Sequence, residues 1–273
     1  MFLSEKFCYL DLHRTGSVQL QKMFKIKVPE GKITGNHNRA SEKIINSRRV
    51  FVGSIRNPWD WYVSVWSKGC DHTGYSFKRH TNKFFFSNLG FKINPFFATI
   101  IFLSQFFKPT EKWKALYSDN KSKKNFRKWL NMILKERIYD EEAGYGLSSI
   151  KKQCGLYTYK YLGLFSTDTS LLFQRNKHMS YKEIEEFDKK NNLINYFIRT
   201  ESLVKDFCDF LNTINIIVTK DEFDFFCNLE KSNFSKKREL FNYYYDKETI
   251  QLIEQMDRLI IEKHGYSFNN IRN

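Results

Sequence analysis

The chain has 273 residues and a formal net charge of +15. A chain of this length can bury a full hydrophobic core, and we expect one large domain that spans residues 1–273. The positive charge indicates an anionic partner and leaves several classes open: nucleic acid, a membrane surface, a nucleotide cofactor or an acidic glycan.

The cysteines and the apolar segments bear on the compartment. The five cysteines are scattered and form no Cys-x-x-Cys pair, so neither a disulfide framework nor a zinc site is indicated. We therefore expect a reduced, cytoplasmic protein. Charged residues stand where a signal peptide would have its apolar run. The most apolar stretch, Phe96–Phe107, has 12 residues and is too short to span a bilayer as a helix, so we expect no transmembrane segment.

The first motif in the chain is a loop between a strand and a helix. Lys6–Leu12 is apolar and aromatic, as in a strand, and Val18–Phe24 has the spacing of an amphipathic helix. The intervening His13–Ser17 loop contains a glycine and would point its amides at one spot, where phosphate or sulfate binds. Arg14 adds a positive charge there. A plain turn is the alternative, and the absence of Gly-x-x-x-x-Gly-Lys-Ser/Thr disfavours a kinase or ATPase.

A second strand, turn and helix follow about 40 residues later. Val50–Ile55 is continuously apolar, as in a buried parallel strand, and Pro58 suits the first turn of a helix. Arg56 would therefore lie at the carboxyl end of a strand, where open α/β sheets bind ligands. With Ser64 on the helix, it suits a terminal phosphate. Alternatively, Arg56 pairs with a carboxylate and Ser64 is a surface hydroxyl.

These motifs resemble the sulfotransferases that use 3′-phosphoadenosine 5′-phosphosulfate (PAPS). The similarity consists of a basic residue before Thr-Gly, then Arg-Asn-Pro with Ser eight positions after the Arg. In that family the first loop holds the 5′-phosphosulfate, and the later Arg and Ser hold the 3′-phosphate. Most members have lysine where this chain has Arg14. By position, the cofactor contacts that the resemblance implies are Arg14, Thr15, Gly16, Ser17, Arg56 and Ser64.

The resemblance also implies a catalytic base. Lys32–His37 is a short strand that ends in a Gly-Asn-His turn. Many carbohydrate-type sulfotransferases have a Gly-His pair at this place, and its histidine takes the acceptor proton. Here Asn36 is inserted before His37. His13 is the rival base because it neighbours Arg14, and a solvent-exposed loop histidine is the alternative without catalysis.

The carboxyl third returns to the family pattern. Leu193–Ile198 is expected to be a strand, and Arg-x-Glu-x-Leu followed by Asp-Phe resembles a sulfotransferase segment in which Glu201 anchors backbone or an arginine. A basic loop, Asn233–Arg238, precedes a long amphipathic helix that runs through His264. The resemblance implies that this loop folds over the nucleotide; a solvated run of charges is the alternative. The lid candidates are Lys236, Lys237 and Arg238.

The middle of the chain is the least informative part. The aromatic residues of Gly69–Asp119 would form either an insertion over an acceptor cleft or the core of a helical subdomain. Further helices are expected over Phe126–Arg137, Gly146–Tyr161 and Ser180–Asn191, the last capped by Ser180. We expect this helical insertion to cover about residues 69–190.

Together these patterns predict one α/β domain with a mainly parallel sheet flanked by helices, in the P-loop-like fold of sulfotransferases. The resemblance implies transfer of a sulfuryl group from PAPS to a hydroxyl of a carbohydrate or small molecule. His37 would be the general base and Arg14 would stabilise the leaving group, without a metal. The alternative is a non-catalytic basic protein that binds nucleotide or nucleic acid. No nucleic-acid partner is expected, because the basic residues are dispersed and no recognised binding module is present.

Overall fold

A single sheet organises the chain. The computed structural model describes residues 1–85, 99, 102–103, 105–136, 144–173, 178–230 and 238–269. Five strands pair in the order β3-β1-β2-β4-β5. Their bounds are β1 (Phe2–Leu3), β2 (Phe7–Leu10), β3 (Lys32–Ile33), β4 (Val50–Ile55) and β5 (Tyr196–Arg199). The strands β2, β4 and β5 are parallel, whereas β1 is antiparallel to both β2 and β3. The α/β class is confirmed, and the sheet is mixed, with a parallel centre.

The parallel centre follows from the two most apolar strands. All four residues of β2 are buried, and β4 is buried over its last five residues. They pair from Phe7 opposite Val50 to Leu10 opposite Gly53. Strands buried on both faces need apolar residues at every position, which explains the continuous runs in the sequence. Because β2 and β4 are parallel neighbours, the loops after Leu10 and Ile55 leave the same edge of the sheet.

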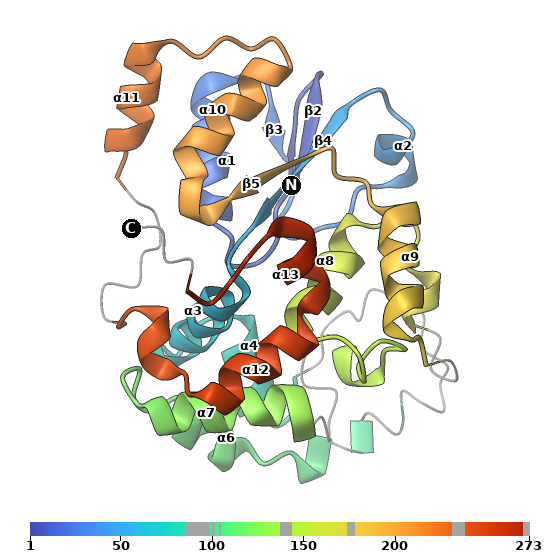
Figure 1. Cartoon of the computed structure of the whole chain (residues 1–273), viewed down its shortest axis with the longest axis vertical. Coiled ribbons are helices and arrows are strands. Elements are labelled where there is room, and N and C mark those ends of the chain that lie inside the picture. Colours follow the sequence, from blue (N-terminus) through green and yellow to red (C-terminus); the bar gives the residue numbers. More distant parts are fainter. Residues whose placement is uncertain are drawn as a thin grey trace.

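The helices cover the sheet and extend well beyond it (Figure 1). Their bounds are α1 (Ser17–Lys27), α2 (Glu42–Ile45), α3 (Pro58–Cys70), α4 (Tyr75–Thr81), α6 (Thr110–Leu116), α7 (Lys123–Asn131), α8 (Leu156–Phe165), α9 (Tyr181–Asn191), α10 (Leu203–Thr213), α11 (Lys220–Asn228), α12 (Lys247–Met256) and α13 (Arg258–His264). Figure 1 shows α1 and α10 beside the sheet, with α3, α6, α7 and α12 grouped below it. Among the described residues, no helix is both long and apolar enough to cross a membrane.

Aromatic side chains fill the space between the sheet and α1 and α10. The rings of Phe7 and Phe24 have centroids 4.9 Å apart, and Phe24 lies at the same distance from Phe207. Phe210 meets Phe7 edge to face at 5.3 Å. Tilted and edge-to-face pairs at these distances are favourable beyond the area that they bury. This cluster fixes α1, and with it the loop that precedes α1, against β2.

The helix α3 is the centre of the second, larger core. Its Trp59, Trp61 and Trp66 are each no more than 1% exposed. Trp61 stacks on Tyr157 of α8 with ring centroids 4.5 Å apart. Gly53 of β4 makes room for Phe165, since a Cβ at this position would lie 2.9 Å from the Phe165 ring. The helix that follows Arg56 is therefore held over most of its surface.

The middle of the chain is helical, and its aromatic residues divide between the two expected roles. Trp113 and Tyr117 are fully buried, and the hydroxyl of Tyr117 accepts a hydrogen bond from the Trp129 indole at 2.7 Å. These residues form a core. Tyr75 and Phe77, by contrast, line a cavity. Half of Phe96–Phe107, together with residues 86–95, lies outside the described residues.

Several predicted boundaries differ from the observed ones. The last part of Phe126–Arg137 is a π-helical turn, Met132–Glu136, and Arg137 lies outside the described residues. The helix expected from Gly146 begins only at Leu156, after a 3₁₀ turn. The capping box of α9 is confirmed: Ser180 and Glu183 satisfy each other's backbone amides. Other 3₁₀ turns are Gln105–Phe107, Ser170–Phe173, Thr200–Ser202 and Phe241–Tyr244.

The expected long carboxyl-terminal helix is divided into α12 and α13 at Asp257. This residue is fully buried, and its carboxylate accepts hydrogen bonds from the Tyr62 hydroxyl at 2.7 Å and from the Thr158 amide and hydroxyl at 2.9 and 2.8 Å. Asp257 therefore joins α3, α8 and the last two helices. Burial raises the pKa of Asp257 to about 6, although the three hydrogen bonds act in the opposite direction.

We expect this carboxyl group to make stability depend on pH. The folded pKa of about 6 lies above the ordinary value of 3.8, so the folded state binds the proton more tightly than the unfolded state does. Stability present below about pH 4 is therefore lost as the pH rises to about 6. In urea unfolding at pH 4–7, the wild-type free energy of unfolding should fall by up to about 3 kcal/mol relative to Asp257→Asn.

The exposed residue Asp209 provides a matched control. It pairs with Lys205 on the surface of α10, and Asp209→Asn should leave the pH dependence unchanged. A difference between wild type and Asp257→Asn that stays constant from pH 4 to pH 6 would contradict the raised pKa.

Candidate functional site

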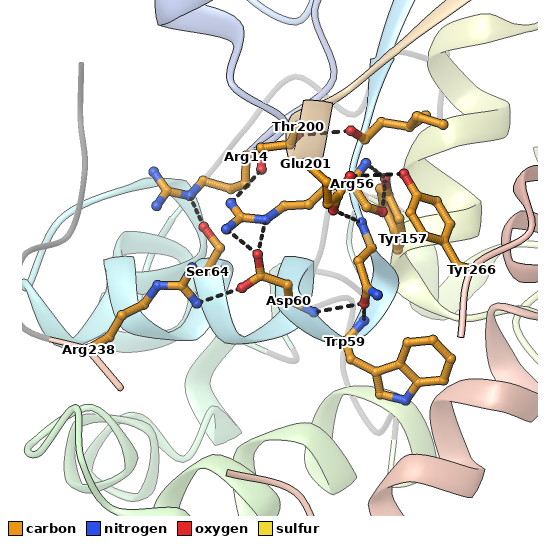
Figure 2. A network of polar contacts seen from close by, with 12 residues as sticks. Arg14, Arg56, Trp59, Asp60, Ser64, Tyr157, Thr200, Glu201, Arg238 and Tyr266 are labelled. Atoms are coloured by element: carbon orange, nitrogen blue, oxygen red, sulfur yellow. Dashed lines mark hydrogen bonds and ion pairs between the residues drawn. The ribbon is translucent and has the colours of Figure 1, made fainter. Parts of the chain in front are cut away.

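The two predicted anion-binding loops meet at the carboxyl edge of the sheet. The Arg14 Nε donates a hydrogen bond to the Ser64 hydroxyl at 3.0 Å, and the Arg56 Nη1 donates to the Arg14 carbonyl at 3.2 Å. Figure 2 shows the three side chains converging: Arg14 from the loop before α1, Arg56 from the turn between β4 and α3, and Ser64 from α3. Residues 50 positions apart thus form one polar site.

The first loop has a backbone that few side chains tolerate. Arg14 and Gly16 have φ angles of 62° and 80°, in the left-handed region. A Cβ on Gly16 would lie 2.5 Å from the end of the Leu203 side chain, so a larger residue here would be strained and would have to displace Leu203. Ser17 begins α1 directly afterwards. Thr15 turns inward: its hydroxyl bonds the Leu12 carbonyl at 2.7 Å, so a ligand would meet its backbone.

The backbone of Arg56 is fixed by residues from elsewhere in the chain. Its amide donates to the Tyr157 hydroxyl at 2.9 Å, and that hydroxyl lies 3.1 Å from the Arg56 carbonyl, to which it donates. The next amide, of Asn57, donates to Glu201 at 2.6 Å, and the Asn57 side chain caps α3. The expectation that Glu201 anchors backbone is confirmed. Figure 2 shows this frame around the arginine.

Asp60 connects two arginines. Its Oδ2 accepts hydrogen bonds from the Arg56 Nε at 2.7 Å and Nη2 at 2.5 Å, and its Oδ1 accepts one from the Arg238 Nη1 at 2.8 Å. Burial raises the pKa of Asp60, but the charges and hydrogen bonds of the two arginines outweigh it and lower the pKa below its ordinary value. Asp60 is therefore a carboxylate at neutral pH.

We call Arg14, Arg56 and Arg238 the arginine cluster. Burial, followed by the charges of Arg56 and Arg238, lowers the pKa of Arg14 to about 10. The pairing of Arg56 with a carboxylate is thus correct, but Ser64 is not a surface hydroxyl, since it is only 2% exposed. The cluster has three guanidinium groups, and Asp60 accepts hydrogen bonds from two of them, Arg56 and Arg238. One carboxylate does not neutralise three cations, so positive charge is left for an anion.

Arg238 belongs to the predicted lid. Its side chain is 14% exposed and reaches α3, so at this position the run of charges is not simply solvated. Lys236 and Lys237 lie outside the described residues. Of the three lid candidates, the structure therefore describes only Arg238.

The two candidate bases, His13 and His37, form a stacked pair with ring centroids 3.5 Å apart. We call them the histidine pair. The Nδ1 of His37 lies 2.7 Å from the Asp11 carbonyl, which can only accept, so Nδ1 carries the proton and Nε2 keeps its lone pair. The His37 amide also donates to the Asp11 carboxylate at 3.0 Å. His37 is therefore held in the tautomer whose Nε2 lone pair can accept a proton.

Burial lowers the pKa of both histidines. For His13 the pKa falls well below its ordinary value, through burial and then the charge of Lys160. For His37 burial again lowers the pKa, while the hydrogen bond to Asp11 and the charge of Asp11 partly oppose it. Both rings are therefore neutral at pH 7, and His37 is the stronger base of the two.

A cavity of about 260 Å³ opens beside the histidine pair. Its walls include His13, Arg14, His37, Trp61, Lys68 and Lys160. The loops after β2 and β3 thus meet α3, α4 and α8 around one space. A cavity that borders two neutral histidines and Arg14 of the arginine cluster is a candidate ligand site.

Sequence reasoning missed three charged residues here. Asp60 could have been found, because it lies one helical turn after Arg56 and such pairs face each other. Asp11 and Lys160 gave no local signal, since their roles depend on contacts made by the fold. Among the described residues, no group of three or more metal-ligating side chains could hold a metal ion.

Comparisons with protein families, curated proteins and solved structures find no significant match to this chain. The assignment of this site therefore depends on its own residues and geometry.

The charge of Asp60 should control how strongly the arginine cluster binds anions. We expect Asp60→Asn to lower the melting temperature in buffer without sulfate or phosphate by at least about 2–4 °C, the equivalent of about 1 kcal/mol in a chain of this size. Added sulfate should restore the loss by neutralising the arginines. Melting temperatures in sodium sulfate and in sodium chloride of equal ionic strength measure this.

Asp209→Asn is again the control, because it removes a carboxylate from an exposed pair on α10 that is not part of the cluster. It should respond to sulfate as the wild type does. Equal sulfate stabilisation of Asp60→Asn and wild type would mean that Asp60 does not compete with an anion.

Proposed function

We propose that the chain is a sulfotransferase of the P-loop-like fold that uses PAPS to sulfate a hydroxyl of a carbohydrate or small molecule. The observation that carries this proposal is the convergence of Arg14, Arg56 and Ser64 beside a cavity that holds the histidine pair. The parallel centre of the sheet supports the fold assignment, because both loops leave its carboxyl edge. The helical region near the cavity would be the acceptor-side insertion.

The residues present fit a donor with two anionic ends. In the proposal, the amides of Thr15 to Ser17 and the Arg14 guanidinium hold the 5′ end, at the start of α1. Arg56 and Ser64 hold the 3′-phosphate. Arg238 already lies beside this site through Asp60, and it would add a third positive charge over the nucleotide. Their contribution is position and charge neutralisation.

The chemistry assigned to the chain is proton removal and charge stabilisation. When bound, PAPS would supply the sulfuryl group: a bond forms between sulfur and the acceptor oxygen, and the bond from sulfur to the 5′-phosphate oxygen breaks. His37 Nε2 would take the hydroxyl proton, with Nδ1–H held by the Asp11 carbonyl. Arg14 would stabilise negative charge on the departing phosphate.

The 3′-phosphate assignment can be tested by ligand selectivity. Arg56→Ala should weaken binding of adenosine 3′,5′-bisphosphate by about 10- to 150-fold, since a charged hydrogen bond contributes about 1.5–3 kcal/mol. Binding of adenosine 5′-phosphate should change much less. Titration calorimetry with both ligands measures the difference.

Arg258→Ala is the matched control, because this arginine is exposed on α13 and pairs with Glu262. It should bind both ligands as the wild type does. If Arg56→Ala weakens both ligands equally, Arg56 does not hold the 3′-phosphate. If the wild type binds neither ligand, the nucleotide proposal itself is wrong.

The base can be tested by turnover. His37→Ala should lower the rate of PAPS-dependent sulfation by about 10²–10⁴-fold, with little change in affinity for adenosine 3′,5′-bisphosphate. The base must be neutral, and burial lowers the pKa of His37, so the wild-type rate should rise with pH through a value below 6.5 and be level at pH 7. The residual rate of the variant should lack this rise.

His13→Ala distinguishes the two bases. Because His13 is the weaker base, its removal should cost less than removal of His37. Loss of turnover in His13→Ala with normal turnover in His37→Ala would identify His13 as the base.

A further inference from the structure

A serine interrupts the apolar strand β4. Ser54 is fully buried, and the other residues from Phe51 to Ile55 are apolar or glycine. It lies on the same face of the sheet as Val52, which packs in one core cluster with Phe24 of α1. A buried hydroxyl destabilises a fold unless it is hydrogen-bonded, so the partners of Ser54 explain why this position is polar.

Two other buried hydroxyl groups contact Ser54. The Ser54 Oγ lies 2.8 Å from the Tyr9 hydroxyl and 2.6 Å from the Thr15 hydroxyl, and all three side chains are fully buried. Burial raises the pKa of Tyr9 well above its ordinary value, although the hydrogen bond to Ser54 acts in the opposite direction. Tyr9 therefore keeps its proton at neutral pH and can donate it in a hydrogen bond.

The last hydrogen bond of this group fixes the direction of the others. The Leu12 carbonyl can only accept, so the single hydroxyl hydrogen of Thr15 is donated to it, at 2.7 Å. Thr15 must then accept from Ser54, and Ser54 must accept from Tyr9. The result is a directed chain from Tyr9 through Ser54 and Thr15 to Leu12, in which each hydroxyl hydrogen has an acceptor.

This chain holds the first anion-binding loop at its least favourable part. Thr15 lies between Arg14 and Gly16, which both have left-handed φ angles. Gly16 is the N-cap residue of α1 and has no side chain with which to satisfy the first amides of the helix. Ser54 thus ties the side chain of Thr15 to β4, and the backbone amides of the loop are left for a ligand.

We infer that Ser54 is a positioning residue for the donor nucleotide: it anchors Thr15 and so aims the loop amides and Arg14 at the 5′ end. The inference rests on the proposed sulfotransferase activity and adds a residue on which binding of the 5′ end depends. Ser54 is fully buried, so it acts through Thr15 and not by contact with the ligand. The loop then has its binding shape before the ligand arrives, which lowers the cost of binding.

Ligand selectivity tests this role. Ser54→Ala should weaken binding of adenosine 3′,5′-bisphosphate by about 2- to 13-fold, the change that loss of a single hydrogen bond produces. Binding of adenosine 3′-phosphate, which lacks the 5′ phosphate, should change little. Arg56→Ala, by contrast, should weaken both ligands, because each has the 3′-phosphate. Titration calorimetry with both ligands measures the difference.

Tyr9→Phe is the matched control, because it removes a hydroxyl from the far end of the chain and leaves the bond from Ser54 to Thr15 in place. It should bind both ligands as the wild type does. Ser54→Ala leaves the Tyr9 hydroxyl without its acceptor, which destabilises the core. The double variant Tyr9→Phe/Ser54→Ala removes that hydroxyl as well, so it should regain thermal stability and keep the binding defect.

Two results would overturn the inference: bisphosphate binding by the double variant equal to that by Tyr9→Phe, or equal weakening of both ligands. If the wild type binds neither nucleotide, the proposed function fails, and sulfate then tests Ser54 by itself. Compared with sodium chloride of equal ionic strength, sodium sulfate should raise the melting temperature of Tyr9→Phe more than that of the double variant. Equal shifts would mean that Ser54 does not position the loop for an anion.

Discussion

The site depends on keeping like charges close together. Three guanidinium groups from distant parts of the chain meet at the carboxyl edge of the sheet, and burial, followed by their mutual repulsion, lowers the pKa of Arg14. Asp60 makes this possible, because a single carboxylate receives hydrogen bonds from both Arg56 and Arg238. The balance remains positive. The charge that the fold cannot neutralise internally is the charge that an anionic ligand would neutralise.

The surrounding structure keeps that charge in place without help from a ligand. The Tyr157 hydroxyl bonds both the amide and the carbonyl of Arg56, and Glu201 holds the next amide. Trp61 in turn stacks on Tyr157, so the frame belongs to the core of α3 and α8. Polar groups fixed before binding need little reorganisation when a ligand arrives, which favours both affinity and catalysis. Several of the aromatic residues counted as core are thus positioning elements.

Local patterns predicted the parts of the fold that local chemistry determines. The strand Val50–Ile55, the helix start at Pro58 and the cap at Ser180 are all observed, because burial, a missing amide and a capping hydroxyl act within a few residues. Long-range contacts decided the rest. The two-residue β1 exists only by pairing with β2 and β3, and the break at Asp257 depends on partners about 100 and 195 residues away.

The same distinction explains what the sequence could say about the site. Arg14, Arg56 and Ser64 stood out because each follows a recognisable strand or helix start. Lys160 did not, since nothing around it in α8 marks it as part of a cavity. Yet its charge acts on both rings: burial lowers the pKa of both histidines most, and the charge of Lys160 lowers it further. Because a fixed cation disfavours the imidazolium that forms when a histidine takes a proton, Lys160 weakens both rings as bases while it helps to keep them unprotonated.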